Sequence, residues 1–216
     1  MGPASSVGSA RRRLAAGPLG RTVRQARRQL AIVRQTRQLR PDHIALAASG
    51  HTIHVDPSDR RGREIVRGLG RGHQPALLEL WRRAVACTDP AIVLDVGSNY
   101  GEFVLNARYP AGARVLAVEA NPRVVPRLQR SIADHPDGTR IELHPVLAAD
   151  HDGGRATPLV DPSWSGSAGT SLDRTQDGDD LVELVVPVRT IDALVAAGPA
   201  PSGALLVKID TEGSEA

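Results

Sequence analysis

The 216-residue sequence predicts an α/β fold built on a doubly wound parallel sheet. Four short apolar runs lack the alternation of apolar and polar residues that a half-exposed strand shows, so they predict strands covered on both faces. Helical stretches follow the first two runs, at about 101–108 and 122–133. Strands and helices that succeed one another in this way pack as a parallel sheet with helices on its faces.

The first 40 residues predict a basic appendage outside the sheet. They contain ten arginines and no acidic residue. Residues 1–20 are rich in Gly, Pro, Ser and Ala, which is typical of disorder, and residues 21–40 place Val23, Leu30 and Val33 on a loose helical stripe. Such a helix could lie on nucleic acid or make a weak contact with an anionic membrane surface, whereas the simpler interpretation is a solvated helix or tail.

Residues 41–90 predict a lead-in to the sheet. The stretch "HTIHVDP" (51–57) alternates like a short strand, and residues 73–88 place apolar side chains on one face of a helix. We therefore divide the chain into a tail (1–40), this lead-in, and a sheet domain (91–216).

The four apolar runs that predict sheet strands are 91–96, 113–120, 140–148 and 204–210. Before the last run, residues 150–190 are polar and rich in turn residues, which predicts a long excursion over the sheet edge or over a ligand crevice. The stretch "LVELVVPVRTIDAL" (181–194) then predicts a strand that leads into a helix.

Composition excludes several classes of partner. Of the 27 Lys and Arg, ten lie in the first 40 residues, which leaves 17 basic residues against 24 acidic ones in the rest. An acidic body and an aromatic content of 2% lead us to expect no nucleic-acid partner. A single cysteine, no secretory signal and no membrane-spanning run favour a cytoplasmic protein.

The stretch "VLDVGSNYGEF" (93–103) predicts a ligand-binding turn at the carboxyl end of the first strand. Gly97 and Gly101 allow a sharp turn and a close approach of the backbone to a ligand. The second glycine of the dinucleotide fingerprint G-x-G-x-x-G is missing, and Asp95 would repel a diphosphate. A cationic ligand with an amino-acid end, such as S-adenosylmethionine, fits this turn better than NAD does.

A second carboxylate supports a nucleoside ligand. Glu119 ends the next strand, where an acidic side chain accepts hydrogen bonds from ribose hydroxyls. We expect no metal site among the histidines, because none of the seven has a convincing ligand spacing. The turn and Glu119 together predict a site for S-adenosylmethionine.

Four segments resemble the successive motifs of the FkbM family of S-adenosylmethionine-dependent methyltransferases: "VLDVGSNYGEF", "VLAVEANPRVVPRL", "VPVRTIDAL" and "LLVKIDTEGSEA". The closing motif is the most specific of them. The resemblance implies the Rossmann-like sheet of class I methyltransferases. It also implies an O-methyltransferase acting on a hydroxyl of a sugar, glycolipid or secondary metabolite, so the substrate would be a small molecule or a glycan.

The resemblance also implies cofactor contacts. The residues carried over by motif are Asp95, Gly97, Asn99 and Gly101 at the methionine end, Glu119 at the ribose, and Asn121 beside the adenine. Asp150 could accept from the adenine amine or could simply be a turn residue. The stretch "SGSAGTS" (165–171) stands where the family has a serine-rich segment, or is plain loop.

The closing motif predicts the catalytic groups. Lys208 and Asp210 share one face of the last strand, and Glu212 follows in the turn. We expect Asp210 or Glu212 to accept the proton of the acceptor hydroxyl, with Lys208 tuning that carboxylate or anchoring the substrate. Two alternatives stay open: the carboxylates could ligate a divalent cation, or the cluster could only order the turn.

One departure from the family is plain. Its members continue past the closing motif, whereas this chain stops at Ala216. We therefore expect a C-terminally incomplete sheet whose last strands are missing, an unprotected apolar strand at 204–210, poor solubility and little activity. The alternatives are a catalytically deficient cofactor-binding fragment, a binding module that uses the basic tail and, least favoured, an NAD-type oxidoreductase.

Overall fold

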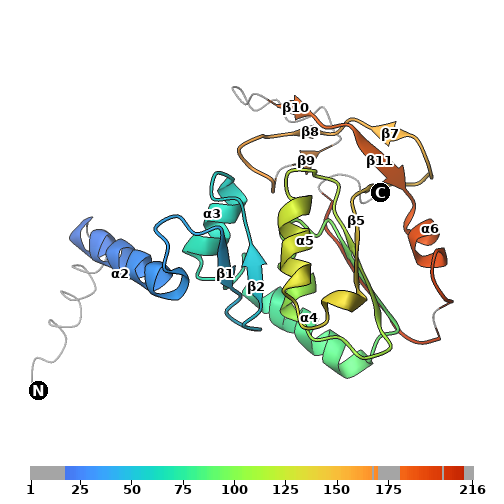
Figure 1. Cartoon of the computed structure of the whole chain (residues 1–216), viewed down its shortest axis with the longest axis horizontal. Helices are drawn as coiled ribbons and strands as arrows, with labels where there is room; N and C mark the ends of the chain where they lie inside the picture. The colour runs from blue at the N-terminus through green and yellow to red at the C-terminus, as the bar shows by residue number, and fades with distance from the viewer. Residues whose placement is uncertain (1–17, 167, 170–180, 201, 212–216) are drawn as a thin grey trace, which may run out of the picture. The chain divides into compact units, whose positions relative to one another are not determined.

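The computed structural model describes residues 18–166, 168–169, 181–200 and 202–211. The chain divides into two compact units, Met1–Pro41 and Asp42–Ala216. In the first unit, helix α2 spans Pro18–Thr36 (Figure 1). The helix ends where Arg37 adopts a left-handed φ of 57°, and the Arg37 amide donates to the Val33 carbonyl at 2.7 Å.

The second unit is built on a four-stranded sheet. Its strands, in spatial order, are β12 (Leu205–Ile209), β3 (Ile92–Val96), β4 (Arg114–Val118) and β5 (Ile141–His144). Every neighbouring pair is parallel. The sequence-based prediction of a mixed α/β fold with a parallel sheet is confirmed, and each of the four strands lies within a predicted apolar run.

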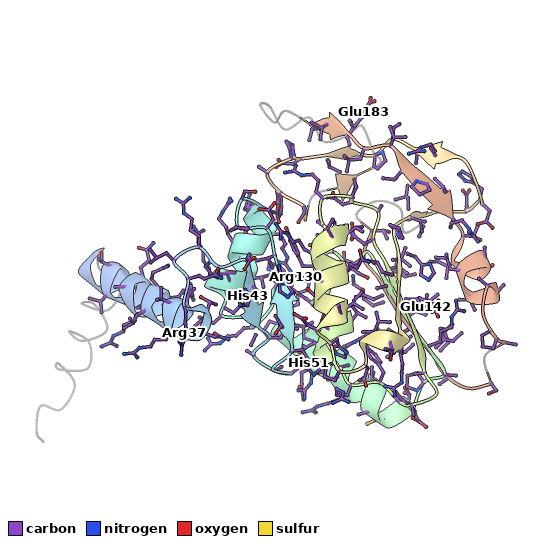
Figure 2. The ribbon with its side chains drawn as sticks, viewed as in Figure 1. Arg37, His43, His51, Arg130, Glu142 and Glu183 are labelled. Atoms are coloured by element: carbon purple, nitrogen blue, oxygen red, sulfur yellow. The ribbon has the colours of Figure 1, made fainter. Side chains whose placement is uncertain are left out.

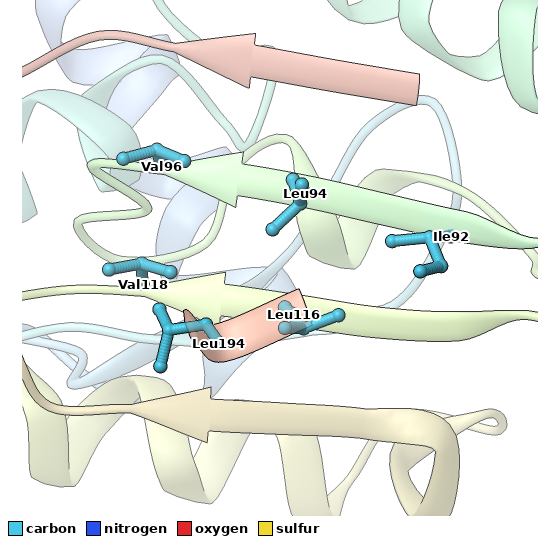
Figure 3. Packing of buried hydrophobic residues seen from close by; sticks show 6 residues of the cluster. All are labelled: Ile92, Leu94, Val96, Leu116, Val118 and Leu194. Atoms are coloured by element: carbon cyan, nitrogen blue, oxygen red, sulfur yellow. The ribbon is translucent and has the colours of Figure 1, made fainter. Parts of the chain in front are cut away.

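The core lies on the central strands. All five residues of β3 are buried, which explains why its sequence does not alternate. One face of β3 and β4 packs against Leu194 of helix α6, which spans Ile191–Ala196 (Figure 3). The buried side chains of this cluster are Ile92, Leu94, Val96, Leu116, Val118 and Leu194.

Arg114 joins three elements at the other end of the sheet from the strand C-termini. Its guanidinium donates to both carboxylate oxygens of Glu142 on β5, at 2.7 and 2.9 Å (Figure 2). It also donates to the carbonyls of Val195 at 2.8 Å and Leu194 at 3.1 Å. A bidentate pair of this kind fixes geometry as well as charge, so it holds the end of α6 against the edge of the sheet.

The lead-in has more structure than the sequence predicts. Strands β1 (His43–Ala45) and β2 (Thr52–His54) pair antiparallel. Helix α3 (Arg60–Arg67), which was not predicted, begins where Asp59 accepts from the Gly62 amide at 2.9 Å. Helix α4 (Pro75–Thr88) confirms the predicted helix and begins with its proline.

The predicted helix at about 101–108 is wrong. The structure has only a short 3₁₀ turn there, η1 (Val104–Asn106). Gly101 has a φ of 90°, which no α-helix accommodates. The Val104 amide donates to the Asp95 carboxylate at 3.2 Å instead of to a helical carbonyl. The turn therefore supplies a hydrogen bond to the buried Asp95. The predicted helix at 122–133 is confirmed as α5 (Val125–Ala133).

The predicted strand at 140–148 breaks in two, because Pro145 lacks an amide proton and ends the ladder. After the break, β6 (Leu147–Ala148) joins a second small sheet with β11 (Val186–Arg189) and β7 (Arg155–Ala156). A third sheet is made of β8 (Leu159–Val160), β9 (Ala168–Gly169) and β10 (Val182–Glu183). Residues 150–190 therefore hold short strands within the predicted excursion, and β11 leading into α6 confirms the predicted strand and helix.

Helix α6 starts at a side-chain cap, with the Thr190 hydroxyl accepting from the Ala193 amide at 3.1 Å. Among the residues that the structure describes, no helix is long and apolar enough to cross a membrane.

Candidate functional site

A cavity of about 340 Å³ lies at the carboxyl ends of the sheet strands in the second unit. The turn after β3 contributes Gly97 and Asn99, the end of β4 contributes Glu119, and the end of β12 contributes Lys208 and Asp210. In open α/β sheets, ligands bind at this edge. The volume is within the range of roughly 300–1,000 Å³ that small-molecule sites occupy.

The turn after β3 is shaped by close packing. Gly97 has a φ of 74°, and a Cβ built on it would lie 2.0 Å from the Asp210 carbonyl oxygen. Gly101 has a φ of 90°, and its Cβ would lie 2.7 Å from Leu128 Cδ1. Asn99 between them is also left-handed, with a φ of 48°. Only glycine fits the first two positions, so the turn sequence is set by sterics as well as by any ligand.

Asp95 does not line the cavity. The residue is 0% exposed and lies beneath the turn, where its Oδ2 accepts from the Val104 amide and its Oδ1 lies 3.2 Å from Lys208 Nζ. The sequence-based expectation that Asp95 contacts the cofactor directly is therefore not what this geometry favours. The charge of Asp95 can still affect ligand binding indirectly, because its carboxylate accepts a hydrogen bond from the turn at Val104.

Lys208 is held by the same turn. Its ammonium donates to the carbonyls of Gly97 at 2.8 Å and Val96 at 3.3 Å, in addition to the ion pair with Asp95. The ammonium also lies 5.2 Å from the centroid of the Phe103 ring. An ammonium has three protons, so these contacts leave Lys208 little capacity to anchor a substrate.

Glu119 is buried and already hydrogen-bonded. Its Oε2 accepts from the Asn99 amide at 2.7 Å, and its Oε1 accepts from the Asn121 amide at 2.8 Å. Burial raises the pKa of Glu119, against these two hydrogen bonds and the charge of Lys208. Because a carboxylate has about four acceptor positions, the group can hold the turn and still accept from ligand hydroxyls.

Two predicted cofactor residues lie away from the cavity lining. Asn121 is buried in the turn after β4, where its Oδ1 accepts from the Arg123 amide at 3.0 Å. The Asp150 side chain is 93% exposed and pairs with His151 at 2.8 Å. It follows β6, which has left the main sheet, so the chain turns its carboxylate outward to solvent.

The predicted catalytic carboxylates are only partly described. Asp210 lines the cavity with a side chain that is 63% exposed, and its Oδ2 lies 3.8 Å from Lys208 Nζ. This short distance agrees with the expectation that the two share one face of the strand. Glu212 lies outside the described residues, as do residues 167, 170 and 171 of the stretch 165–171. Within the described residues, no group of three or more His, Cys, Asp or Glu could hold a metal ion.

The sequence did not point to Glu102, a further acidic residue of the cavity lining. Glu102 lines the cavity, forms an ion pair with Arg61 of α3, and accepts from the His73 amide at 3.3 Å. The only local signal was an acid directly after Gly101. Arg61 and His73 come from the lead-in, and no spacing in the sequence links them to the turn.

Residues 161–166 form a segment across the cavity mouth, which we call the strap. Trp164 and Ser165 of the strap line the cavity. The Ser165 amide and hydroxyl donate to Asp59 at 2.7 and 2.8 Å, and Asn99 Nδ2 donates to the Ser165 carbonyl at 2.9 Å. Arg60 stacks on the Trp164 ring at 4.5 Å. The predicted excursion thus passes over the crevice, tied to the lead-in and to the turn.

A family model described as the methyltransferase FkbM domain matches residues 95–216. No curated protein matches the chain. Among solved structures, a possible exported protein from Bordetella parapertussis is 22% identical, with a TM-score of 0.31. That similarity covers 36% of this chain and spans only 27% of the other one.

Proposed function

Because the chain belongs to the FkbM methyltransferase domain family, we propose that it is an S-adenosyl-L-methionine-dependent O-methyltransferase. The acceptor we propose is a hydroxyl of a sugar, a glycolipid or a secondary metabolite. The observation that carries the proposal is the cavity at the strand C-termini, where the tight Gly97 turn faces the buried carboxylate of Glu119. A Rossmann-like doubly wound arrangement is part of the proposal. Its support is the strand order β12-β3-β4-β5, in which the chain passes to opposite sides of β3.

The residues around the cavity fit such a cofactor. A Cβ at position 97 would collide with the Asp210 carbonyl, so only glycine forms this turn, and the backbone of the turn would hold the methionine end. Glu119 would accept from the ribose hydroxyls. When bound, the cofactor supplies an electrophilic methyl group on a sulfonium.

The chain's own residues would act mainly by positioning. Holding the reacting groups in a good orientation can lower the activation free energy by roughly 7–11 kcal/mol relative to reactants free in solution. Asp210 lines the cavity, and of the two predicted carboxylates it is the one that the structure describes. As general base it would raise the reaction rate about 10²–10⁴-fold. Lys208 would hold the Gly97 turn and the carboxylates of Asp95 and Asp210 in place, rather than bind substrate.

Ligand-dependent thermal stability tests the cofactor assignment. S-adenosylmethionine should raise the Tm of the wild type, because a ligand that binds only the folded state stabilises it. Gly97→Ala should abolish that rise. Gly153→Ala is the matched control: Gly153 also has a positive φ, of 82°, but nothing lies within 4 Å of its added Cβ. A rise with NADH and none with S-adenosylmethionine would favour an oxidoreductase instead.

Turnover tests the catalytic assignment. Asp210→Asn should lower kcat and leave the Kd for S-adenosylmethionine close to that of the wild type. Undiminished turnover in this variant would discard Asp210 as the base. Loss of activity with a chelator, restored by magnesium, would favour the divalent-cation alternative.

A further inference from the structure

Helix α2 has two chemically distinct faces. At about 100° per residue, Val23, Ala26, Leu30 and Val33 fall within about 80° of one another, and we call this set the apolar stripe. The described arginines Arg24, Arg27, Arg28 and Arg34 project from the remaining surface of the helix, and we call them the basic face.

The apolar stripe meets solvent. Val23 is 51% exposed and Leu30 is 50% exposed. Isolated exposed apolar residues need no explanation, but here they recur at helical spacing beside arginines. The helix has no acidic residue in its first turn, and residues 1–40 contain no Asp or Glu. The helix therefore carries a net positive charge.

We propose that α2 docks onto an anionic lipid bilayer, with the apolar stripe inserted at the headgroup boundary and the basic face among anionic headgroups. An interfacial helix needs both features, and it need not be apolar enough to span the bilayer. A nucleic acid would satisfy the arginines but leave the stripe in water. Docking would bring the second unit to a membrane surface whatever reaction it performs.

Sedimentation of the full chain with lipid vesicles tests the proposal. Binding to vesicles of phosphatidylcholine mixed with phosphatidylglycerol should be at least about tenfold tighter than binding to phosphatidylcholine alone, because anionic headgroups attract the arginines. The stripe variant Val23→Ser/Leu30→Ser should lower the affinity for the mixed vesicles about tenfold or more, since less apolar area is buried. The variant Arg27→Gln/Arg28→Gln should lower it similarly and reduce its dependence on salt.

Helix α4 supplies matched controls. Leu77→Ser/Leu80→Ser removes two exposed leucines, 46% and 61% exposed, from another helix. Arg82→Gln/Arg83→Gln removes two adjacent arginines that pair with Glu79. Both controls should bind the mixed vesicles like the wild type.

Three outcomes would overturn the proposal. Equal binding to neutral and anionic vesicles would remove the charge argument. Unchanged binding by the stripe variant would show that α2 binds anions through its arginines without inserting its apolar side chains. Tighter binding to a DNA duplex than to vesicles, unaffected by the stripe variant, would assign the helix to nucleic acid.

Discussion

At the scale of single residues, the ion pair of Asp95 and Lys208 holds the backbone turn that lines the cavity. Asp95 is fully buried, and its nearest cation is Lys208, 3.2 Å away. Lys208 in turn donates to the Gly97 carbonyl at 2.8 Å. A charge at the end of β12 therefore fixes the backbone that follows β3, and neither side chain needs to touch the ligand to affect its binding.

Lys208→Met should weaken S-adenosylmethionine binding about tenfold or more, because a hydrogen bond from a charged donor is worth about 1.5–3 kcal/mol. It should also lower the Tm, since Asp95 is left as a buried unpaired charge. Calorimetric titration and thermal unfolding measure the two effects.

The variant Asp95→Asn/Lys208→Met separates them. It should recover part of the Tm, because no charge is then left unpaired, while the binding loss remains. Arg155→Met, at an exposed arginine, is the control for removal of a cation. Binding like wild type in Lys208→Met would contradict the positioning role.

His135 makes stability depend on pH. Burial lowers its pKa to about 4, helped by the neighbouring ring of His51. The imidazole accepts from the Asp137 amide at 3.0 Å and lies 3.1 Å from the Ala107 carbonyl, which suits the neutral ring. The unfolded chain takes up a proton near the ordinary pKa of 6.5, and the folded chain does so only near 4.

Stability is therefore complete above about pH 6.5 and should fall as the pH drops from there to about 4. Unfolding in urea at a series of pH values measures this slope. His135→Gln should be less stable at neutral pH but flatter across the same window. His151→Gln, at a side chain that is 66% exposed, should keep the wild-type slope. A wild-type slope in His135→Gln would assign the effect to another group.

At the scale of elements, the strap depends on contacts far apart in the chain. Asp59 caps α3 and also accepts from the amide and hydroxyl of Ser165. One carboxylate thus orders a helix of the lead-in and the segment over the cavity. The Asp59 side chain thus connects the two elements, together with Arg60, which stacks on Trp164.

Ser165→Ala should loosen the strap and leave α3 intact. Amide hydrogen exchange should become faster at residues 164–166 and stay unchanged in α3, because the helix keeps its cap. Asp59→Ala should accelerate exchange in both and cost about 0.5–2 kcal/mol through the lost cap. Ser163→Ala, at an exposed position, is the matched control. Equal exchange in Ser165→Ala and Ser163→Ala would show that the hydrogen bond from the Ser165 hydroxyl to Asp59 does not hold the strap.

At the scale of the whole molecule, the main sheet has one poorly covered strand. In the described part of the chain, β12 lies at the edge of the sheet, and Leu205, Val207 and Ile209 are 54%, 40% and 56% exposed. An exposed apolar edge strand is a template for pairing with another chain. We therefore expect this strand to promote self-association of the chain.

Val207→Lys should reduce self-association of the chain at high concentration, because a charge on an edge strand opposes pairing. Sedimentation velocity over a concentration series measures it. Val182→Lys is the matched control, since Val182 is 39% exposed on the short strand β10. Identical self-association in Val207→Lys and the wild type would place the association surface elsewhere.

The sequence by itself determined the sheet and the turn at its edge. Runs of apolar residues without alternation predicted the four strands of a parallel sheet, and the central strands β3 and β4 are covered on both faces as expected, whereas the edge strand β12 is not. Gly97 and Gly101 were identifiable because glycines directly after a buried strand indicate a sharp turn, and both have a positive φ. Strand β11 and helix α6 were also predictable, since Thr190 is a local cap. All of these follow from interactions between near neighbours in sequence or from burial alone.

Only the tertiary structure decided how the site is assembled. It buried Asp95 beneath the turn and exposed Asp150 to solvent. It also placed a 3₁₀ turn where a helix was predicted, and the Val104 amide of this turn donates a hydrogen bond to Asp95. It also brought Glu102 to Arg61, and Ser165 to Asp59. These contacts join segments tens of residues apart, and each depends on where the sheet places the ends of its strands. A local pattern carries no information about that placement, because it is set by the packing of the whole unit.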